Sequence, residues 1–156
     1  MRKIRIVAVG KDKESWVADG VAHYRKLLSR YASIELESVA KARLSASATP
    51  DEIRKTEGQA ILRMVQGGAT VALSDAGRRM TSSEFARALD NLTSHQRGVL
   101  TFIIGGPHGL DPKVISQADT VLSLSPLTFS HQIVRLVLLE QLYRAFTILE
   151  GGDYHK

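Results

Sequence analysis

The sequence predicts an α/β fold, in which a mainly parallel sheet carries helices on both faces. Segments with the pattern of strands alternate along the chain with segments of helical periodicity, as they do in linked β-α-β units. Several strand segments are apolar at every position, which is typical of strands covered on both faces. The chain has 156 residues, the length of one domain, so we expect residues 1–156 to form a single domain.

Four elements are predicted in the first part of the chain. Residues 4–9 form an apolar strand that ends in a glycine turn, and residues 15–31 have apolar side chains at helical spacing. Residues 33–39 alternate in the manner of a short strand. The Thr-Pro-Asp-Glu motif at 49–52 supplies a capping residue, a proline and two first-turn acids, so a helix is predicted from there to about residue 65.

Five further elements follow. Residues 69–73 and 99–104 are apolar strands, and residues 120–124 form a third, shorter strand. A Thr-Ser-Ser-Glu sequence fits a capping box and opens a helix over residues 81–93. A short helix is predicted over residues 112–117.

The last predicted helix begins near His131 and ends at the glycines 151–152, and it has few polar positions. A small domain rarely buries a helix on all sides. We therefore expect one of its faces to pack on the sheet and another on a second subunit, in a homodimer. Arg135, Glu140 and Arg144 interrupt the apolar run, which argues against a membrane span.

Composition excludes several classes of site. The chain has no cysteine, so it has no disulfide, thiolate metal site or cysteine nucleophile. Its five histidines show no metal-ligand spacing, and no metal site is expected. There is no targeting segment, and the expected location is the cytoplasm.

The excess of positive over negative charge is confined to the first part of the chain. Residues 1–66 hold 13 Lys and Arg against 8 Asp and Glu, whereas residues 67–156 hold 8 of each. A basic face of this kind binds phosphate backbones, or it is simply a solvated surface that keeps the protein soluble. The charge alone does not decide between the two.

Ligands of open α/β sheets bind at the carboxyl ends of the strands. Three predicted strand ends carry unusual loops, at residues 73–77, 104–109 and 124–129. The glycines of the second loop allow close approach to a ligand, but they match neither the dinucleotide fingerprint nor the P-loop. The third loop is mostly apolar; it suits an adenine ring, or it is a plain connection whose side chains complete the core.

Several longer motifs resemble one known family. They are Ile6-Val-Ala-Val-Gly-Lys11, Phe102-Ile-Ile-Gly-Gly-Pro-His-Gly-Leu110, Leu122-Ser-Leu-Ser-Pro-Leu-Thr-Phe129, His131-Gln-Ile-Val-Arg135, Glu140-Gln-Leu-Tyr-Arg-Ala145 and Tyr154-His155-Lys156. The chain resembles the large-subunit rRNA methyltransferase H family over nearly its whole length. These trefoil-knot (SPOUT) enzymes methylate N3 of a pseudouridine in 23S rRNA.

The resemblance implies a deep C-terminal trefoil knot, S-adenosylmethionine as methyl donor, no metal, a homodimer, and 23S rRNA in the ribosome as partner. By motif match, the cofactor contacts fall on Leu73, Gly105, Leu124, Ser125, Pro126, Leu127, Thr128 and Phe129. Two positions depart from the family pattern. Ser74 stands where members commonly have an acid, and Ser130 stands where they tend to have proline.

Four residues are candidates for the chemistry. N3 must lose a proton before it attacks a methyl group, and His155 or Tyr154 of the tail is hypothesised to assist. Arg144 is hypothesised to stabilise the negative charge that develops on the base. His131 begins the last helix, whose dipole disfavours a charged imidazole, so it is expected to position rather than to titrate. A frayed, inactive tail is the alternative.

Two other functions stay open at this point: a trefoil-knot methyltransferase acting on tRNA, and a non-catalytic ribosome- or RNA-binding module. Cofactor binding separates the module from both enzymes, because the module has no reason to bind S-adenosylmethionine.

Overall fold

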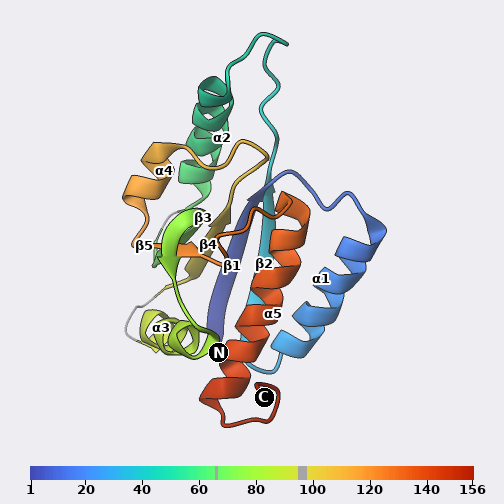
Figure 1. Ribbon diagram of the computed structural model, residues 1–156, viewed down its shortest axis with the longest axis vertical. Coiled ribbons are helices and arrows are strands. Elements are labelled where there is room, and N and C mark those ends of the chain that lie inside the picture. The colour runs from blue at the N-terminus through green and yellow to red at the C-terminus, as the bar shows by residue number, and fades with distance from the viewer. Residues whose placement is uncertain (66, 95–97) are drawn as a thin grey trace.

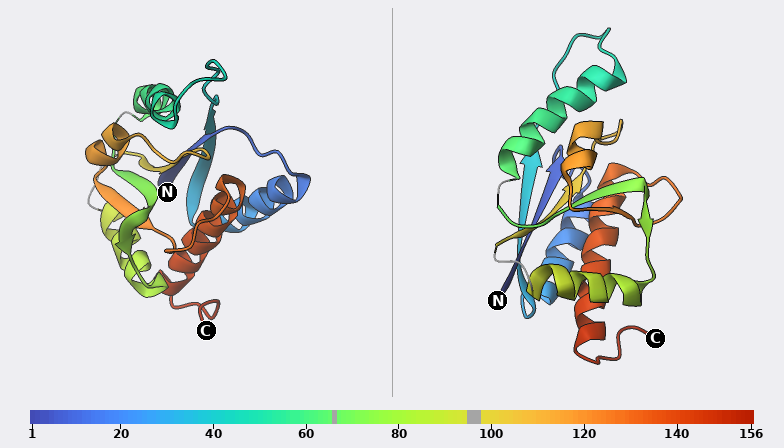
Figure 2. Two further views of the ribbon diagram at one scale, coloured as in Figure 1. Left: turned by 45° about the horizontal axis from the view of Figure 1, so that its top comes forward. Right: turned by 90° about the vertical axis from the view of Figure 1, so that its left-hand side faces the viewer.

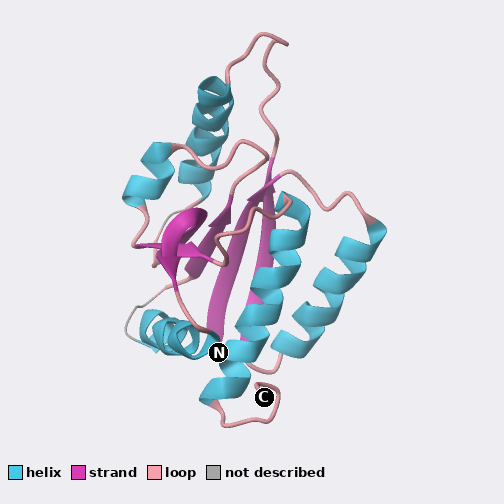
Figure 3. Cartoon of the chain, in the orientation of Figure 1, coloured by secondary structure: helices cyan, strands magenta, loops and turns pink. Residues whose placement is uncertain are grey.

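The computed structural model describes residues 1–65, 67–94 and 98–156, and its centre is a five-stranded sheet (Figures 1 and 3). The strand order is β2-β1-β4-β3-β5, and every pairing is parallel. The elements are β1 Arg2–Val9, α1 Ser15–Leu28, β2 Ala32–Val39, α2 Pro50–Met64, β3 Thr70–Arg79, α3 Ser82–Ser94, β4 Leu100–Ile104, α4 Pro112–Gln117, β5 Thr120–Ser123 and α5 His131–Leu149. The predicted α/β fold is confirmed.

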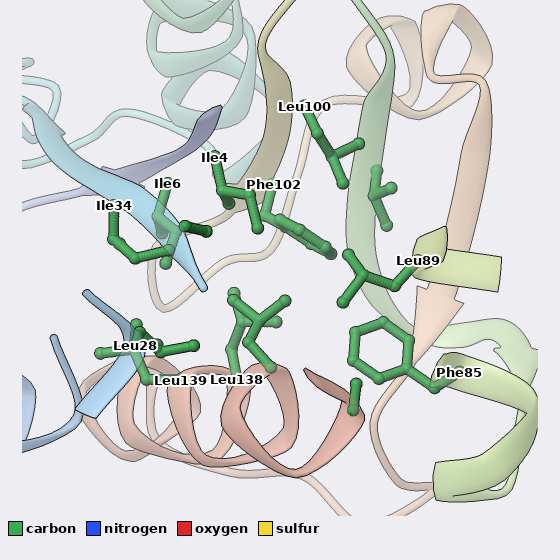
Figure 4. Close-up of a cluster of buried hydrophobic side chains, with 14 of the residues drawn as sticks. Ile4, Ile6, Leu28, Ile34, Phe85, Leu89, Leu100, Phe102, Leu138 and Leu139 are labelled. Atoms are coloured by element: carbon green, nitrogen blue, oxygen red, sulfur yellow. The ribbon is translucent and has the colours of Figure 1, made fainter. Parts of the chain in front are cut away.

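Helices cover both faces of the sheet, as the sequence predicts (Figure 2). On one face, α1, α3 and α5 pack over Ile4, Ile6 and Phe102, and the buried Leu138 and Leu139 of α5 lie against these strand residues (Figure 4). On the other face, α2 and α4 enclose a smaller apolar cluster. Burial of these side chains is the main stabilising contribution to the fold.

Local signals set the helix starts. Thr49 accepts a hydrogen bond from the backbone N–H of Glu52, and the Glu52 carboxylate accepts one from Thr49, which completes a capping box. Thr81 and Glu84 repeat this arrangement at the start of α3. Both starts are confirmed, and each cap contributes about 1 kcal/mol to stability.

The prediction that β3 ends at residue 73 is wrong. The strand continues to Arg79 through an irregularity in its pairing with β5, and Arg78 lies opposite Leu122. Gly77 makes this possible, because a Cβ there would lie 2.7 Å from the backbone carbon of Leu122. The sequence after residue 73 resembles a turn, but in the structure the close approach of its backbone to β5 keeps the segment extended.

The loop between β1 and α1 is held against the start of α5. Arg135, which is 3% exposed, donates to the carbonyl oxygens of Val9 (3.0 Å) and Gly10 (2.7 Å) and pairs with Asp12 at 2.6 Å. Gln132 donates to the Lys11 carbonyl at 3.1 Å. We refer to these contacts of Arg135 and Gln132 as the α5 clamp.

Loss of the clamp is expected to destabilise the fold. In Arg135→Met, two carbonyl groups lose their donor and Asp12 loses its partner, so the free energy of unfolding should fall by about 3 kcal/mol, the low end for a broken buried pair because Asp12 keeps some solvent contact. Urea denaturation followed by circular dichroism measures this. The exposed Arg87→Met serves as control, and a loss in Arg135→Met no larger than in Arg87→Met would contradict the clamp.

α5 is not covered all round by this chain. It packs between α1 and α3 on the sheet, while Ile133, Val137, Glu140 and Arg144 form a partly exposed stripe along its outer side. In the described part of the chain, no helix is both long enough and apolar enough to span a bilayer.

Candidate active site

A cavity of about 610 Å³ opens at the carboxyl ends of β4 and β5 and at the irregularity within β3, beside the start of α5. All three segments that the sequence singled out contribute to its wall, although the first of them lies within β3 rather than after it. Seven of the eight predicted cofactor residues line it: Leu73, Gly105, Leu124, Ser125, Leu127, Thr128 and Phe129. Pro126 lies in the same loop but is not part of the wall. The topology thus brings the predicted strand ends together at one edge of the sheet.

Gly105 ends β4 at a point with no room for a side chain. A Cβ at this position would lie 2.7 Å from the carbonyl carbon of Gly109 and 2.9 Å from its oxygen. The following turn is closed by a hydrogen bond from the Gly109 N–H to the Gly106 carbonyl (2.9 Å), and Gly109 has a φ of +80°. The loop can adopt this conformation only because residues 105 and 109 are glycines.

Serines shape the loop that follows β5. The Ser123 hydroxyl donates to the Ser125 carbonyl, and the Ser125 hydroxyl accepts from the backbone N–H of Leu127, both at 3.0 Å. Ser130 then caps α5 by accepting from the Ile133 N–H at 3.2 Å. The serine at position 130 therefore replaces proline with a functional cap. Leu127 projects at the mouth of the cavity and is 69% exposed.

His131 is the only predicted catalytic residue on the cavity wall. Burial, followed by the charges of Lys41, Arg135 and Lys13, lowers the pKa of His131 below its ordinary value of 6.5. Its Nε2 atom is buried and has no hydrogen-bond partner among the residues described. The imidazole is therefore neutral at pH 7. Burial and neighbouring cations account for this, whereas the sequence pointed to the helix dipole.

Removal of a neighbouring positive charge should change the pKa of His131. In Lys41→Gln, protonation of His131 costs less, so the pKa of His131 should rise toward 6.5 while burial still keeps it lower. NMR titration of the imidazole carbon resonances measures the shift. Lys113→Gln, which removes a distant exposed charge, should leave the value unchanged. An unaltered titration in Lys41→Gln would rule out the coupling.

The other three predicted catalytic residues meet around Glu140. Its Oε1 atom accepts from Arg144 (2.6 and 3.0 Å) and from the Tyr154 hydroxyl (3.2 Å). The Arg144 guanidinium lies over the Tyr154 ring at 4.8 Å and contacts Nδ1 of His155 at 3.4 Å. Burial, then Tyr24 and Glu140, raise the pKa of Tyr154 to about 12. We call Glu140, Arg144, Tyr154 and His155 the tail cluster.

Sequence reasoning missed Glu140 as the centre of the tail cluster. The signal was available, because Glu140 lies four residues before Arg144 on the same helix and therefore faces it. The contacts also show that the tail is not frayed in this structure.

The cavity and the tail cluster are far apart within one chain. His131 and Arg144 are 13 residues apart on α5, which places them about 20 Å apart along the helix axis. In Figure 1, α5 starts at the upper edge of the sheet and the C-terminus lies below the opposite edge. The structure therefore brings the cofactor residues and His131 together, but not with Arg144, Tyr154 and His155.

A parallel α/β domain with a glycine-lined cavity at this edge of the sheet is typical of enzyme domains that bind a nucleotide-like cofactor. The described residues include no group of three His, Asp or Glu side chains placed to hold a metal ion. A family described as "Predicted SPOUT methyltransferase" matches residues 2–155. The chain belongs to the SPOUT methyltransferase family, and within it to the group of its large-subunit rRNA methyltransferase H relatives.

Two of these relatives show the extent of the similarity. The protein named "Ribosomal RNA large subunit methyltransferase H" of Lactobacillus delbrueckii subsp. bulgaricus is 41% identical over 157 residues, covering 98% of this chain and 99% of that protein. The protein of the same name from Symbiobacterium thermophilum is 43% identical over 160 residues, covering 99% of each.

Solved structures show the same fold at low identity. A probable methylase family protein of Haemophilus influenzae has a TM-score of 0.60 at 15% identity, covering 99% of this chain and 71% of that chain. A putative methyltransferase of Legionella pneumophila, solved with S-adenosylmethionine bound, has a TM-score of 0.52 at 13% identity, covering 93% of this chain and 66% of that chain. The trefoil knot implied by the resemblance stays a prediction.

SPOUT methyltransferases use S-adenosylmethionine, and the cavity fits this cofactor. Its volume lies within the range of small-ligand sites. Leu73, Leu124 and Phe129 supply apolar surface for a planar ring, and the loop backbone supplies donors and acceptors. The absence of a Cβ at Gly105 leaves the backbone open to close approach.

Proposed function

We propose that the protein transfers a methyl group from S-adenosylmethionine to N3 of a pseudouridine in 23S rRNA, as a homodimer in the cytoplasm, where ribosomes are. The observation that carries this proposal is the match, over nearly the whole chain, to relatives named for methylation of large-subunit rRNA. The cavity supports it, because its wall is built from the residues that the resemblance assigns to the cofactor.

The bound cofactor supplies an electrophilic methyl group, and the residues of the chain orient the acceptor and manage its proton. Methyl transfer is an in-line displacement, so placement of N3 contributes much of the rate. Tyr154, with its pKa of about 12, stays protonated at neutral pH and therefore orients by hydrogen bonding. His155 is left as the group that accepts the N3 proton, and Arg144 stabilises the negative charge on the base.

A second copy of the chain would join the two halves of this site. The outer stripe of α5 runs from Ile133, near the cavity, to Arg144, in the tail cluster. If two copies pack through this stripe about a two-fold axis with their helices antiparallel, the tail cluster of each lies beside the cavity of the other. We therefore propose that Arg144, Tyr154 and His155 act on a substrate held at the partner's cavity.

Methyl transfer to ribosomes that lack the modification tests the proposed function. Labelled S-adenosylmethionine is supplied with free rRNA, separate subunits, assembled ribosomes or tRNA, and the modified nucleoside is identified by mass spectrometry. Methyl-pseudouridine in large-subunit RNA is expected. Transfer to tRNA instead would redirect the function to a tRNA methyltransferase, and no cofactor binding at all would leave only an RNA-binding module.

Mixed dimers test the shared site. Gly105→Ala damages the cavity and Arg144→Ala damages the tail cluster, so each homodimer should be inactive. In a random mixture, the heterodimers carry one intact site, and about a quarter of the wild-type activity should return. If each tail serves its own cavity, no mixture recovers activity. Co-purification of the two variants, one of which carries an affinity tag, confirms that the subunits exchange.

A further inference from the structure

Two lysines from different parts of the chain meet beside the cavity. Lys13 belongs to the loop after β1, and its backbone N–H donates to the Gln132 side chain at 3.1 Å. Lys41 follows β2, and its Cε atom would lie 3.1 Å from a Cβ at Gly10. The Lys41 side chain lies along the loop that carries Lys13, and the two positive charges are near enough to repel each other. The parallel pairing of β1 with β2 and the α5 clamp therefore hold two like charges together.

These two charges are not balanced by the protein. Arg135, whose charge also acts on Lys41, is paired with Asp12. The Glu57 carboxylate, which acts on Lys41 in the opposite sense, is buried and accepts from the Ala42 N–H at 3.4 Å. Within residues 1–65, 67–94 and 98–156, no carboxylate lies within ion-pair distance of Lys13 or Lys41. Burial, then Lys13, lowers the pKa of Lys41. An anion that contacts both ammonium groups would remove this repulsion.

The position of the pair indicates which anion it takes. Neither lysine is part of the cavity wall, but the positive charges of both act on His131, which is part of that wall. Lys13 is exposed to solvent at the surface. A group bound here is thus outside the cofactor site but next to it, which is where the backbone of an RNA strand lies when one of its bases enters the site.

Resting on the proposed function, we propose that Lys13 and Lys41 bind one phosphodiester of the substrate RNA beside the nucleotide that is methylated. The two free oxygens of a phosphodiester offer one acceptor to each ammonium group. Within the basic first part of the chain, this site positions the strand rather than merely attracting it. The neutral His131 leaves the positive charge concentrated on the two lysines.

The test compares a Lys13→Gln/Lys41→Gln double variant with a matched control, Arg87→Gln/Lys113→Gln, which removes two exposed charges from α3 and α4. Binding to ribosomes that lack the modification is measured by sedimentation at several salt concentrations, in the presence of S-adenosylhomocysteine. The double variant should bind at least tenfold more weakly, and its log affinity should fall less steeply with log salt, by about 0.7–0.9 in slope, the contribution of one phosphate. Lys13→Arg/Lys41→Arg should restore most of the binding.

Calorimetric titration of S-adenosylhomocysteine separates the two possible anions. Its affinity should be the same in the double variant, the control and the wild type. A tenfold loss of S-adenosylhomocysteine affinity in the double variant, with ribosome binding unchanged, would assign the lysines to the cofactor carboxylate and overturn the proposal. Equal ribosome binding by the double variant and the control would also overturn it. Failure of the wild-type enzyme itself to bind or methylate ribosomes would instead refute the proposed function.

Discussion

Gly105→Ala is expected to lose at least a hundredfold in affinity for S-adenosylmethionine, equivalent to about 2.7 kcal/mol. The added methyl group would meet the Gly109 carbonyl at 2.7–2.9 Å, and this obstacle is backbone rather than a side chain that can rotate away. The turn over residues 105–109 must therefore open, and with it the wall of the cavity. Isothermal titration with S-adenosylmethionine measures the loss.

Gly67→Ala is a suitable control for this substitution. Gly67 has a φ of +72° and open space around it, so alanine there costs about 1 kcal/mol in stability through backbone strain alone. It is absent from the cavity wall, and its variant should bind the cofactor normally. Equal affinities for the two alanine variants would show that close packing at Gly105 does not shape the site.

Arg144→Ala is expected to reduce the rate of methyl transfer by about 10³-fold, because it removes the group that stabilises charge on the base. Cofactor affinity should not change, since Arg144 is not among the residues that form the wall of the cavity. Arg144→Lys should recover little, because Glu140 Oε1 receives two hydrogen bonds from the guanidinium and a lysine cannot reproduce that fork. Single-turnover rates on ribosomes give the measurement.

Substitutions in the tail cluster should reduce the rate of methyl transfer by different amounts, in a definite order. Tyr154→Phe removes only an orienting hydrogen bond to Glu140 and should reduce the rate less than His155→Ala, which removes the proposed proton acceptor. Glu140→Gln should fall between them, because it leaves Arg144 and Tyr154 in place but loosens both. If Tyr154→Phe were the most damaging of the three, His155 would lose its proposed role.

Much of the fold follows from local patterns in the sequence. The caps at Thr49 and Thr81 and the apolar strands place the elements to within a few residues, with β3 as the exception. The position of the cavity could also be predicted from the sequence, because the carboxyl ends of parallel strands lie at the same edge of a sheet. Gly77 misled the prediction, since a glycine marks either a turn or a close backbone approach and the neighbour that decides is β5.

Two features of the site needed the structure. Lys13 and Lys41 are 28 residues apart in the sequence, and only the pairing of Val9 with Val39 brings the loops that follow β1 and β2 together. The separation of Arg144 from the cavity was implicit in its distance from His131 along one helix. What the sequence could not supply was the position of the tail, which returns to Glu140 rather than toward the strand ends.

α5 carries one half of the proposed site at each end and the α5 clamp near its start. Its length therefore sets both the distance between the two halves and their relative rotation about the helix axis. Its 19 residues span about 28 Å. One residue inserted at its middle would shift the tail cluster by about 1.5 Å and turn it by about 100° away from the face it shares with Ile133. In a symmetric dimer this displacement of the tail cluster would occur at both sites. The length of this helix is therefore far less free to vary than that of any loop, such as the one that leads into α2.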